Sequence, residues 1–557
     1  MFQIEVNVHD AVTNAPAGDL PLEGWIRPVE STNLPCYEAV QSFRATRSLP
    51  TGSIDLNGVL FMTLNDDDSF GVVDPRFNLA SANMLKAGRF SERPSAIAFN
   101  RERQAAFFAF ERSGFVQWMG LPTGELSMFV KGLDAPVELF SGGEAGLWII
   151  ERGARRATLY AMTGEERARV SLGEGKPLVA ELADGPLAVY AGGAAVVFDR
   201  STGSVLKAFK GPPQASAITL VRDRSKAAAG LAFMLPEGDK VDLRYLDDPE
   251  RPVLIPLPLK ASRLSASPDG RYLLALEPRG NLSIIDVPLG RVVQAAVLNR
   301  PFREAAFSST TLVLLGADTA GAVALDLSTI REGEAIKLRE IPFGSSAPPV
   351  EDDARLLMAV PYSDQIIAVN RDAQLGFVLD EHSMTIGAPP MNAVSLRGGL
   401  TRRLVAAQRG FYEGSPGRYV TTASVDEPGP YELVLSTGIQ GLSTCVPISV
   451  SGPMSQSQAV RAVIKLGAVS EALAASRPQR LTLQIMQADG KVLAMTEASV
   501  TVQALAFSMR QTVAAQASDG KLLADVVFPA AGSYVVTVDA GAVRNLEIAP
   551  LLLDVSQ

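Results

Sequence analysis

Three side chains of one short segment could together bind a soft metal ion. His382, Met384 and Met391 all lie within the stretch DEHSMTIGAPPM. One imidazole and two thioethers suit Cu(I), which accepts sulfur ligands. Methionine side chains also fill irregular gaps in protein packing, so a polar loop with packed methionines is the alternative. The sequence therefore offers these three residues as candidate metal ligands.

Three consecutive acidic residues could bind a hard cation. Asp66, Asp67 and Asp68 would supply carboxylate oxygens, the ligands that Ca²⁺ prefers. The same residue type also forms turns between strands, because its side chain accepts hydrogen bonds from nearby backbone N–H groups. Calcium binding and a plain turn are both open at this position. A second acidic run, Glu351 to Asp353, is expected to be a solvated loop.

The two cysteines, Cys36 and Cys445, lie on either side of the long middle part of the chain. A single disulfide between them would tie the N-terminal segment to the segment that follows the middle part. Two separate buried thiols are the alternative, because a free cysteine behaves as a small apolar residue. Two cysteines are too few for a disulfide framework or for a zinc site built from cysteine alone.

Motifs for catalysis and for covalent haem are missing from the sequence. The chain has 2 histidines, His9 and His382, and neither has a visible nucleophile partner for a Ser-His-Asp triad. A CxxCH motif does not occur, which excludes covalent c-type haem. GxSxG, HExxH and P-loop motifs are also missing. We therefore predict no catalytic residue and no cofactor-binding residue, and expect a protein that is not an enzyme.

The elements that would position these residues follow a repeat of an apolar strand, a polar or glycine-containing turn and a second apolar strand. Two clear copies are AVVFDRSTGSVL and LSIIDVPLGRVV. The residue before each turn is Asp74, Leu121, Met162, Asp199, Leu246, Asp286, Asp326 or Asn370, so successive copies are 37 to 47 residues apart. This period is typical of β-propeller blades. The sequence predicts seven or eight blades, the first of which can be completed by a strand from the other end.

The flanking segments lack this period. We predict an N-terminal β module over residues 1–48, a propeller over 49–398, an Ig-like β-sandwich over 399–453 and a second β-sandwich over 454–557. Short strands separated by proline and glycine favour the sandwiches. Helix is expected in one stretch, Ser457 to Ser476, because of its alanine and leucine content. The predicted fold class is all-β.

Composition narrows the class of partner. A net charge of −9 argues against nucleic acid, which is bound through lysine and arginine. The sequence contains no apolar run of about 18 residues, so we expect no transmembrane segment. The start, MFQIEVNVHD, alternates like a strand and does not resemble a signal peptide. The numbering then begins at a mature end, or the protein is cytoplasmic.

The repeat SASPDGRYLLAL followed by LSIIDVPLGRVV resembles YVTN-type propellers and the related propeller that carries d-type haem in periplasmic nitrite reductases. The opening DAVTNAPAGDLPLEGWIRP and the stretch PGRYVTTASVDEPGPYELVL are similar to the flanking modules of such bacterial proteins. The resemblance implies a propeller at the cell surface or in the periplasm. It also implies haem binding, which only two histidines do not support. Some YVTN-like propellers are similar to lactonases, which need a carboxylate and basic residues at the central channel.

These observations favour a non-catalytic, extracytoplasmic propeller that acts as a binding or assembly scaffold. Its partner would be a protein or a second copy of the chain. Two alternatives are an accessory subunit of a periplasmic redox complex and a lactonase-like hydrolase. No cofactor is expected, although copper at His382 or calcium at Asp66 would be compatible with the residue types.

Overall fold

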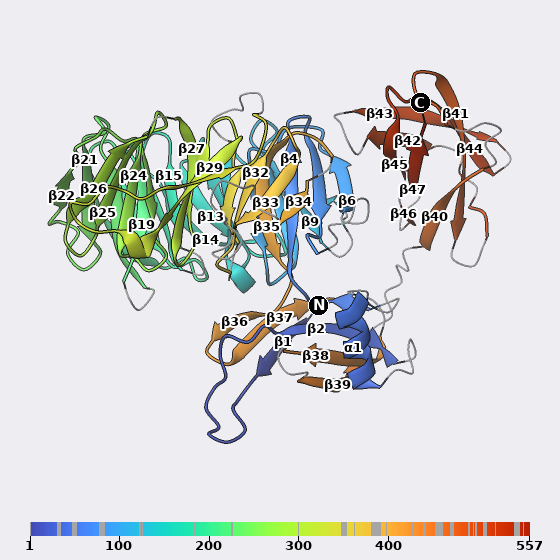
Figure 1. The fold of residues 1–557 in the computed structure, drawn as a ribbon, viewed down its shortest axis with the longest axis horizontal. Coiled ribbons are helices and arrows are strands. Elements are labelled where there is room, and N and C mark those ends of the chain that lie inside the picture. The colour runs from blue at the N-terminus through green and yellow to red at the C-terminus, as the bar shows by residue number, and fades with distance from the viewer. Residues whose placement is uncertain are drawn as a thin grey trace.

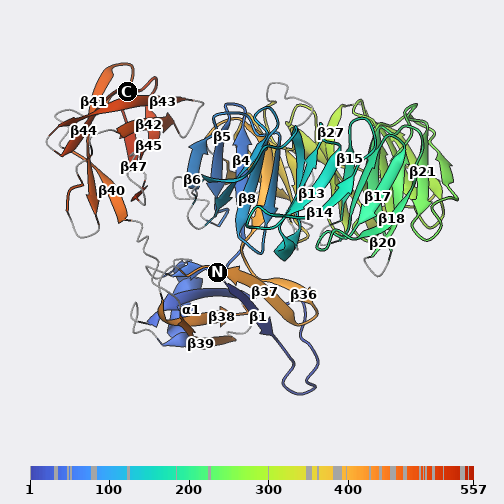
Figure 2. The same ribbon diagram turned by 180° about the vertical axis from the view of Figure 1, so that it is seen from behind.

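The computed structural model describes residues 2–556 except for a set of short segments. The segments left out are 30–34, 47–48, 50–52, 77–83, 122–123, 125, 183–184, 224–226, 299, 347–353, 361–362, 380–391, 397, 426–427, 438–441, 452–459, 468–472, 488–490, 494, 496–497, 505–508, 519, 540–545 and 550. The described chain is almost entirely β-strand, which confirms the predicted all-β class. Figures 1 and 2 show a propeller, a two-sheet domain beside one of its faces and a C-terminal domain beside its rim.

Eight four-stranded antiparallel sheets within the described residues form the propeller blades. Blade 1 contains β35 (Thr401–Gln408), β4 (Val59–Asn65), β5 (Ser69–Val73) and β6 (Met84–Arg89); blade 2 contains β7 (Ala96–Asn100), β8 (Ala105–Phe110), β9 (Phe115–Gly120) and β10 (Leu126–Lys131). Blade 3 contains β11 (Pro136–Ser141), β12 (Leu147–Glu151), β13 (Arg156–Tyr160) and β14 (Glu166–Ser171); blade 4 contains β15 (Leu178–Glu181), β16 (Leu187–Ala191), β17 (Ala194–Phe198) and β18 (Val205–Lys210).

The second half of the ring continues in the same way. Blade 5 contains β19 (Ala217–Arg222), β20 (Ala228–Met234), β21 (Lys240–Tyr245) and β22 (Val253–Pro256); blade 6 contains β23 (Arg263–Ala266), β24 (Tyr272–Leu276), β25 (Asn281–Asp286) and β26 (Arg291–Val297). Blade 7 contains β27 (Phe302–Phe307), β28 (Thr311–Gly316), β29 (Gly321–Asp326) and β30 (Arg339–Pro342); blade 8 contains β31 (Leu357–Ala359), β32 (Ile366–Asn370), β33 (Leu375–Leu379) and β34 (Ala393–Ser395).

The ring closes through strand β35, which follows blade 8 in sequence but belongs to blade 1. It pairs antiparallel with β4, from Thr401 opposite Asn65 to Gln408 opposite Val59. Of the seven or eight blades left open by the sequence, the structure has eight. Seven of the marked residues precede the turn between the third and fourth strands of a blade, whereas Asn370 precedes the turn between the second and third strands of blade 8. The prediction that Asn370 is equivalent to the others is wrong, because an apolar strand precedes both kinds of turn.

Apolar side chains hold neighbouring blades together. The rings of Phe70 and Phe90 in and after blade 1 pack on Phe108 of blade 2, with Phe90 and Phe108 centroids 4.6 Å apart. Every residue of the second strand β8 is buried, because both faces of its sheet are covered by other blades. One sheet cannot bury both of its faces alone, and this requirement produces the repeat in the sequence.

The two-sheet domain combines strands from before and after the propeller. One sheet has the order β1 (Phe2–Asn7), β37 (Arg418–Ala423) and β36 (Tyr412–Ser415); the other has the order β3 (Ile54–Asp55), β2 (Glu23–Pro28), β38 (Gly429–Ser436) and β39 (Ser443–Val450). Strand β1 pairs with β37 and β2 pairs with β38. Ile4, Ile26 and Leu433 are buried together in this domain. The propeller is therefore inserted between the two halves of the two-sheet domain.

Helix α1 (Cys36–Thr46) covers this domain and was not expected from the sequence. Its residues Ala39, Val40 and Phe43 face Trp25, whose ring centroid is 4.8 Å from that of Phe43. This spacing puts the apolar side chains on one face of a helix, and Glu38 in the first turn and Arg44 in the last turn suit the helix dipole. The helical spacing of apolar residues was present in the sequence but extended over only a few residues.

A disulfide joins Cys36 at the start of α1 to Cys445 in β39. The two Cα atoms are 5.8 Å apart, and the cysteines are 409 positions apart in sequence. The bridge therefore fastens the helix to a strand at the edge of the second sheet.

The C-terminal domain is an eight-stranded sheet with the order β46, β40, β41, β44, β43, β42, β45 and β47. The strands are β40 (Val460–Leu466), β41 (Pro478–Gln487), β42 (Ala498–Ala504), β43 (Arg510–Ser518), β44 (Lys521–Val527), β45 (Gly532–Asp539), β46 (Leu546–Ala549) and β47 (Leu551–Val555). Leu483, Val500, Phe528 and Tyr534 lie in its core. The helix predicted over Ser457 to Ser476 is wrong, because β40 occupies residues 460–466 and pairs with β41, and the other described residues of that stretch are not helical. None of the described helices is long and apolar enough to span a membrane.

We predict that the Cys36–Cys445 bridge stabilises the two-sheet domain. The double variant Cys36→Ser and Cys445→Ser should lose about 2–4 kcal/mol of unfolding free energy, because a cross-link restricts the unfolded chain. Calorimetry of the whole chain would show this as a lower transition temperature for the two-sheet domain, with the propeller transition as the internal control. Alkylation of both thiols in denatured protein that has not met a reductant would contradict the bridge.

Candidate functional site

The residues proposed from the sequence as a copper site lie outside the described part of the chain. His382, Met384 and Met391 all fall in the segment 380–391, and Glu351 to Asp353 fall in the segment 347–353. The copper site therefore stays a prediction. Across the described residues, no group of three or more His, Cys, Asp or Glu side chains is gathered as ligands for a metal ion.

The three aspartates at the turn between β4 and β5 have separate partners. The Oδ1 atom of Asp67 accepts hydrogen bonds from the backbone and side chain of Ser69. Asp68, with a φ of 64°, forms an ion pair with Arg93 at 3.0 Å. Asp66 pairs with the fully buried Arg371 of blade 8. These contacts are those of a turn that also links blade 1 to blade 8.

The aspartates that recur with the repeat hold the turns between third and fourth strands. Asp199 Oδ1 accepts the N–H of Ser201 at 2.9 Å and that of Thr202 at 2.7 Å. These hydrogen bonds lower the pKa of Asp199, the bond from the Ser201 hydroxyl most. Asp286 and Asp326 accept backbone N–H groups in the same manner. The turn explains why an acid recurs at this position.

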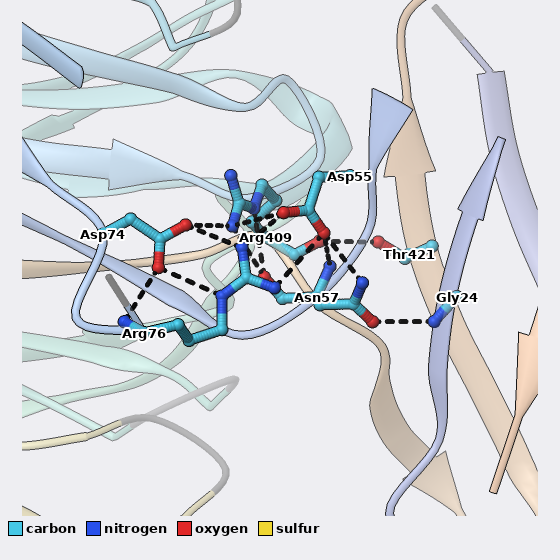
Figure 3. A network of polar contacts seen from close by, with 7 residues as sticks. All are labelled: Gly24, Asp55, Asn57, Asp74, Arg76, Arg409 and Thr421. Carbon is cyan, nitrogen blue, oxygen red and sulfur yellow. Dashed lines mark hydrogen bonds and ion pairs between the residues drawn. The ribbon is translucent and has the colours of Figure 1, made fainter. Parts of the chain in front are cut away.

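In blade 1 the same turn position belongs to a network that joins the propeller to the two-sheet domain (Figure 3). Asp74 follows β5, and Arg76, two residues on, donates Nε to Asp74 Oδ1 at 3.0 Å and Nη2 to Asp74 Oδ2 at 2.6 Å. The same guanidinium also forms an ion pair with Asp55 of β3, which is in the two-sheet domain. Arg76 therefore contacts one carboxylate of the propeller, that of Asp74, and one of the two-sheet domain, that of Asp55.

Arg409 completes the network from the end of β35. Its Nη2 atom lies 2.7 Å from Asp74 Oδ2 and 3.2 Å from Asp55 Oδ2. It also donates to the backbone oxygen of Asn57, whose side chain accepts the N–H of Gly24 at 2.7 Å. Two arginines and two aspartates thus balance each other at the point where the chain enters and leaves the propeller (Figure 3).

Burial and charge act in opposite directions on the pKa of Asp74. Burial raises the pKa, but the hydrogen bonds and charge of Arg76 and the charge of Arg409 outweigh it, so the pKa of Asp74 falls below its ordinary 3.8. For Arg76, burial lowers the pKa, and the two carboxylates outweigh it and raise the pKa. Each of these two groups thus favours the charged form of the other.

Two further contacts fix the same junction. The guanidinium carbon of Arg101, in blade 2, lies 3.6 Å from the ring centroid of Tyr412 in β36. Where the chain re-enters the two-sheet domain, Gly410 donates its N–H to the oxygen of Gly58 at 2.8 Å. A Cβ on Gly410 would meet the backbone nitrogen of Gly58 at 2.7 Å, so only glycine fits this crossing.

A second group of charged residues lies on the first strands of the blades, around the central channel. The first strands of blades 3, 7 and 1 each contain an irregularity, between Pro136 and Glu138, between Phe302 and Glu304, and between Thr401 and Arg403. Irregularities of this kind change the direction of side chains. They place Glu138, Glu304 and Arg403 at equivalent positions of their blades.

The two acids of this group have different surroundings. Glu304 accepts the backbone N–H groups of Leu356 and Leu357 at 2.9–3.0 Å, and Arg303 Nε at 3.1 Å, so it holds the first strand of blade 8. Glu138 has no hydrogen-bond or ion-pair partner among the described residues. Burial raises its pKa, Glu181 raises it further, and Arg403, Arg355 and Lys176 oppose both.

The position of Glu138 follows from the charges that act on it. Arg403 belongs to blade 1 and Arg355 directly precedes blade 8, whereas Glu138 belongs to blade 3. Blade 3 is not a neighbour of blade 1 or blade 8 in the ring, so these charges reach Glu138 from non-adjacent blades. A carboxyl group with a raised pKa and arginine charges acting on it is a candidate for a functional group.

The sequence did not single out Arg76, Arg409 or Glu138. Asp74 was recognised as a turn residue, but Arg409 lies 335 positions away from it. Glu138 is an ordinary glutamate in an apolar strand, and only the ring brings it near Arg355 and Arg403. The spacing of Arg76 two residues after Asp74 was the single local signal.

Comparison with known proteins does not assign the chain to a family. No family model matches the chain, and no curated protein matches it. Among solved structures, it is similar to BamB from Moraxella catarrhalis, with 11% identity over 56% of this chain and 88% of that one and a TM-score of 0.40. Hydrazine synthase from Kuenenia stuttgartiensis matches with 12% identity over 64% and 96% and a TM-score of 0.34. AztD from Citrobacter koseri matches with 11% identity over 55% and 95% and a TM-score of 0.35. Likeness at these identities concerns the fold alone.

We predict that Asp74→Asn weakens the junction. The side chain of Asp74 is 1% exposed, and its loss would leave Arg76 and Arg409 to share the single carboxylate of Asp55 within the network, at a cost of about 3 kcal/mol at neutral pH. Because the pKa of Asp74 is lowered by folding, its contribution is present above pH 3.8 and is lost as the pH falls through the folded value. Denaturant unfolding of the wild type and of Asp74→Asn at several pH values would show the difference in their unfolding free energies decreasing in acid.

The control for this variant is Asp525→Asn, which removes an aspartate from the exposed ion pair with Arg480. It should leave the unfolding curve unchanged. An Asp74→Asn protein as stable as the control at neutral pH would contradict the role of the network.

We predict that Glu138→Gln stabilises the propeller at neutral pH. The pKa of Glu138 is raised in the folded protein, so the folded state holds its proton more tightly than the unfolded state does. Stability is therefore lost as the pH rises from about the ordinary value of 4.5 through the folded value, and glutamine removes that loss. Thermal unfolding at acid and neutral pH would show a gain for Glu138→Gln that grows with pH. Glu340→Gln, in the rim strand β30, is the matched control. A gain that is equal at both pH values would contradict the assignment.

Proposed function

We propose that the protein is a non-catalytic, extracytoplasmic scaffold in which the propeller binds a protein partner or a second copy of the chain. In finer terms, we propose a YVTN-type propeller with Ig-like flanking modules at the cell surface or in the periplasm. The observation that carries this proposal is a set of exposed apolar side chains on the propeller rim, opposite the C-terminal domain.

The rim patch consists of five side chains on consecutive blades. It comprises Val205 and Leu206 of β18, Leu254 of β22, and Leu289 and Val297 of blade 6, which are 53–63% exposed. Strands β22 and β26 lie at the end of the propeller farthest from the C-terminal domain (Figure 1). Exposed apolar side chains grouped on neighbouring elements are typical of interaction surfaces.

The edges of these strands support the same proposal. Strands β18, β22 and β26 are the outermost strands of their four-stranded sheets. Backbone N–H and C=O groups at a sheet edge can accept a strand from another chain. A partner strand laid along the rim would gain backbone hydrogen bonds and cover Leu206, Leu254 or Val297.

The junction supports a scaffold because it fixes surfaces in space. The network of Asp55, Asp74, Arg76 and Arg409 joins the propeller to the two-sheet domain through charged groups that are largely withdrawn from water. Two chain crossings at the same point restrict rotation between the two bodies. A partner would meet both bodies in one fixed arrangement.

The disulfide supports the proposed compartment. Cys36 and Cys445 are bonded, and structural disulfides persist mainly in oxidising surroundings such as the periplasm and the cell surface. A cytoplasmic protein of this kind would be expected to keep these thiols reduced.

A hydrolase is the second candidate, and Glu138 is the observation that favours it. A carboxyl group with a raised pKa, near Arg355 and Arg403 in the central channel, has the residue types that a lactonase-like site needs. This reading requires substrate to enter the channel.

The rim patch provides the test of the scaffold. In the triple variant Leu206→Asp, Leu254→Asp and Val297→Asp, binding of the partner or of a second copy should weaken at least ten-fold, because each buried aliphatic side chain contributes about 1.5–3 kcal/mol. Native mass spectrometry of the protein from its own source would identify the bound partner, and light scattering would report self-association. Val12→Asp, in an exposed loop, is the matched control.

Unchanged complexes in the triple variant would overturn the scaffold proposal at this surface. A coloured partner in the absorption spectrum of the complex would favour the redox alternative. Hydrolysis of a lactone by the wild-type chain, lost in Glu138→Gln, would favour the hydrolase.

A further inference from the structure

A small pocket between the C-terminal domain and the rim of blade 1 has the composition of an anion site. It is lined by Met84, Ala87 and Gly88 of β6 and, from the C-terminal domain, by Thr501, Gln503, Arg510, Val535 and Thr537. Both ribbon views place the C-terminal domain beside β6 (Figures 1 and 2). The side chain of Gln503 also crosses to the propeller and donates to the oxygen of Gly398 at 2.9 Å.

The polar side of the pocket is one face of three neighbouring strands. On β42, Gln503 is paired with Arg510 of β43 and with Val535 of β45. Two residues before it, Thr501 is paired with Thr512 and with Thr537. The alternate residues Val500 and Val502 point into the domain core. The sheet therefore presents a guanidinium, an amide and several hydroxyl groups together toward the propeller.

The main evidence for a ligand in this pocket comes from Arg510. Its Nε and Nη1 atoms are shielded from solvent, and neither has a hydrogen-bond acceptor among the described residues. Buried N–H groups are almost always paired, and an unpaired cation withdrawn from water is costly. Two nitrogen atoms of the guanidinium thus have no acceptor in the described part of the chain.

The positive charge around Arg510 would also favour binding of an anion. Burial lowers the pKa of Arg510 most, the positive charge of Arg89 in β6 lowers it further, and Asp67 opposes both. Asp67 is already engaged by Ser69 within its own turn. Arg89 therefore adds a like charge that acts on Arg510, and none of the described carboxylates lies at hydrogen-bond distance of Arg510.

We propose that this pocket binds one oxyanion group, a carboxylate or a phosphate, at Arg510 of the C-terminal domain, while the exposed Arg89 of blade 1 adds positive charge from outside the pocket lining. Arginine matches the geometry of both groups, and the hydroxyls of Thr501 and Thr537 add donors. The anion offsets the repulsion between the two arginines and so couples its binding to docking of the C-terminal domain on the propeller. The inference does not depend on the scaffold proposal.

Calorimetric titration of the full-length chain with inorganic phosphate, and separately with acetate, tests the site at constant ionic strength in chloride. The wild-type chain should bind at least one of the two with one site. Arg510→Gln should weaken that binding by about ten-fold or more, because it removes a charge-assisted hydrogen bond. Arg480→Gln, which removes an exposed arginine of the same domain, is the control and should bind like the wild type. The preferred anion shows whether the site suits phosphate or carboxylate.

Thermal unfolding provides a second measurement, because the stability difference between Arg510→Gln and the wild type should reverse when the anion is added. In chloride alone, Arg510→Gln should be at least as stable as the wild type, since it removes an unpaired charge from the pocket. In saturating phosphate or acetate, the wild type should gain stability by ligand linkage and the variant should not. Should Arg510→Gln fail to fold, Arg89→Gln changes the propeller side alone and should weaken anion binding in the same direction. Absence of binding by both anions, or equal binding by the wild type and the variants, overturns the proposal.

Discussion

The pairing of β35 with β4 is the constraint on which the rest of the molecule depends. An open row of blades would leave unpaired strands and uncovered apolar faces at both ends, and the closing strand removes both problems at once. It returns the chain to the blade where the propeller began. The residues before β4 and after β35 therefore emerge side by side, and the two-sheet domain can be built from both.

The polar network at the junction belongs to the same geometry. Asp55 and Asn57 stand just before β4, and Arg409 stands just after β35, so closure of the ring brings them together. Asp74 and Arg76 come from the nearest turn of blade 1. A charged group left unpaired at this depth would be costly, and the balanced set of two arginines and two aspartates avoids that cost. The disulfide then fastens α1 to β39 on the far side of the same domain.

Sequence patterns predicted the features of the fold that depend on interactions between residues close together in the chain. The strand and turn repeats indicated the propeller, because each blade has the same need to bury two apolar faces. Aspartates such as Asp199 were placed before turns by the repeat alone, and the structure gives the local reason, their hydrogen bonds to the next few N–H groups. The helix α1 was missed since three apolar residues in one short stretch are a weak signal, and β40 was misread as helix because alanine and leucine content does not reveal the pairing with β41. Arg409, Glu138 and Arg510 could not be predicted, because each acquires its role only from residues far away in sequence.

The interleaved construction of the two-sheet domain also sets an order of folding during synthesis. Strands β1 and β2 are made first, but their partners β37 and β38 are made only after the whole propeller. Strands β1 and β2 therefore stay unpaired, with Ile4 and Ile26 exposed to solvent, until the whole propeller has been synthesised. Contacts between residues this far apart form slowly, so the N-terminal strands are the part of the new chain most in need of protection by a chaperone.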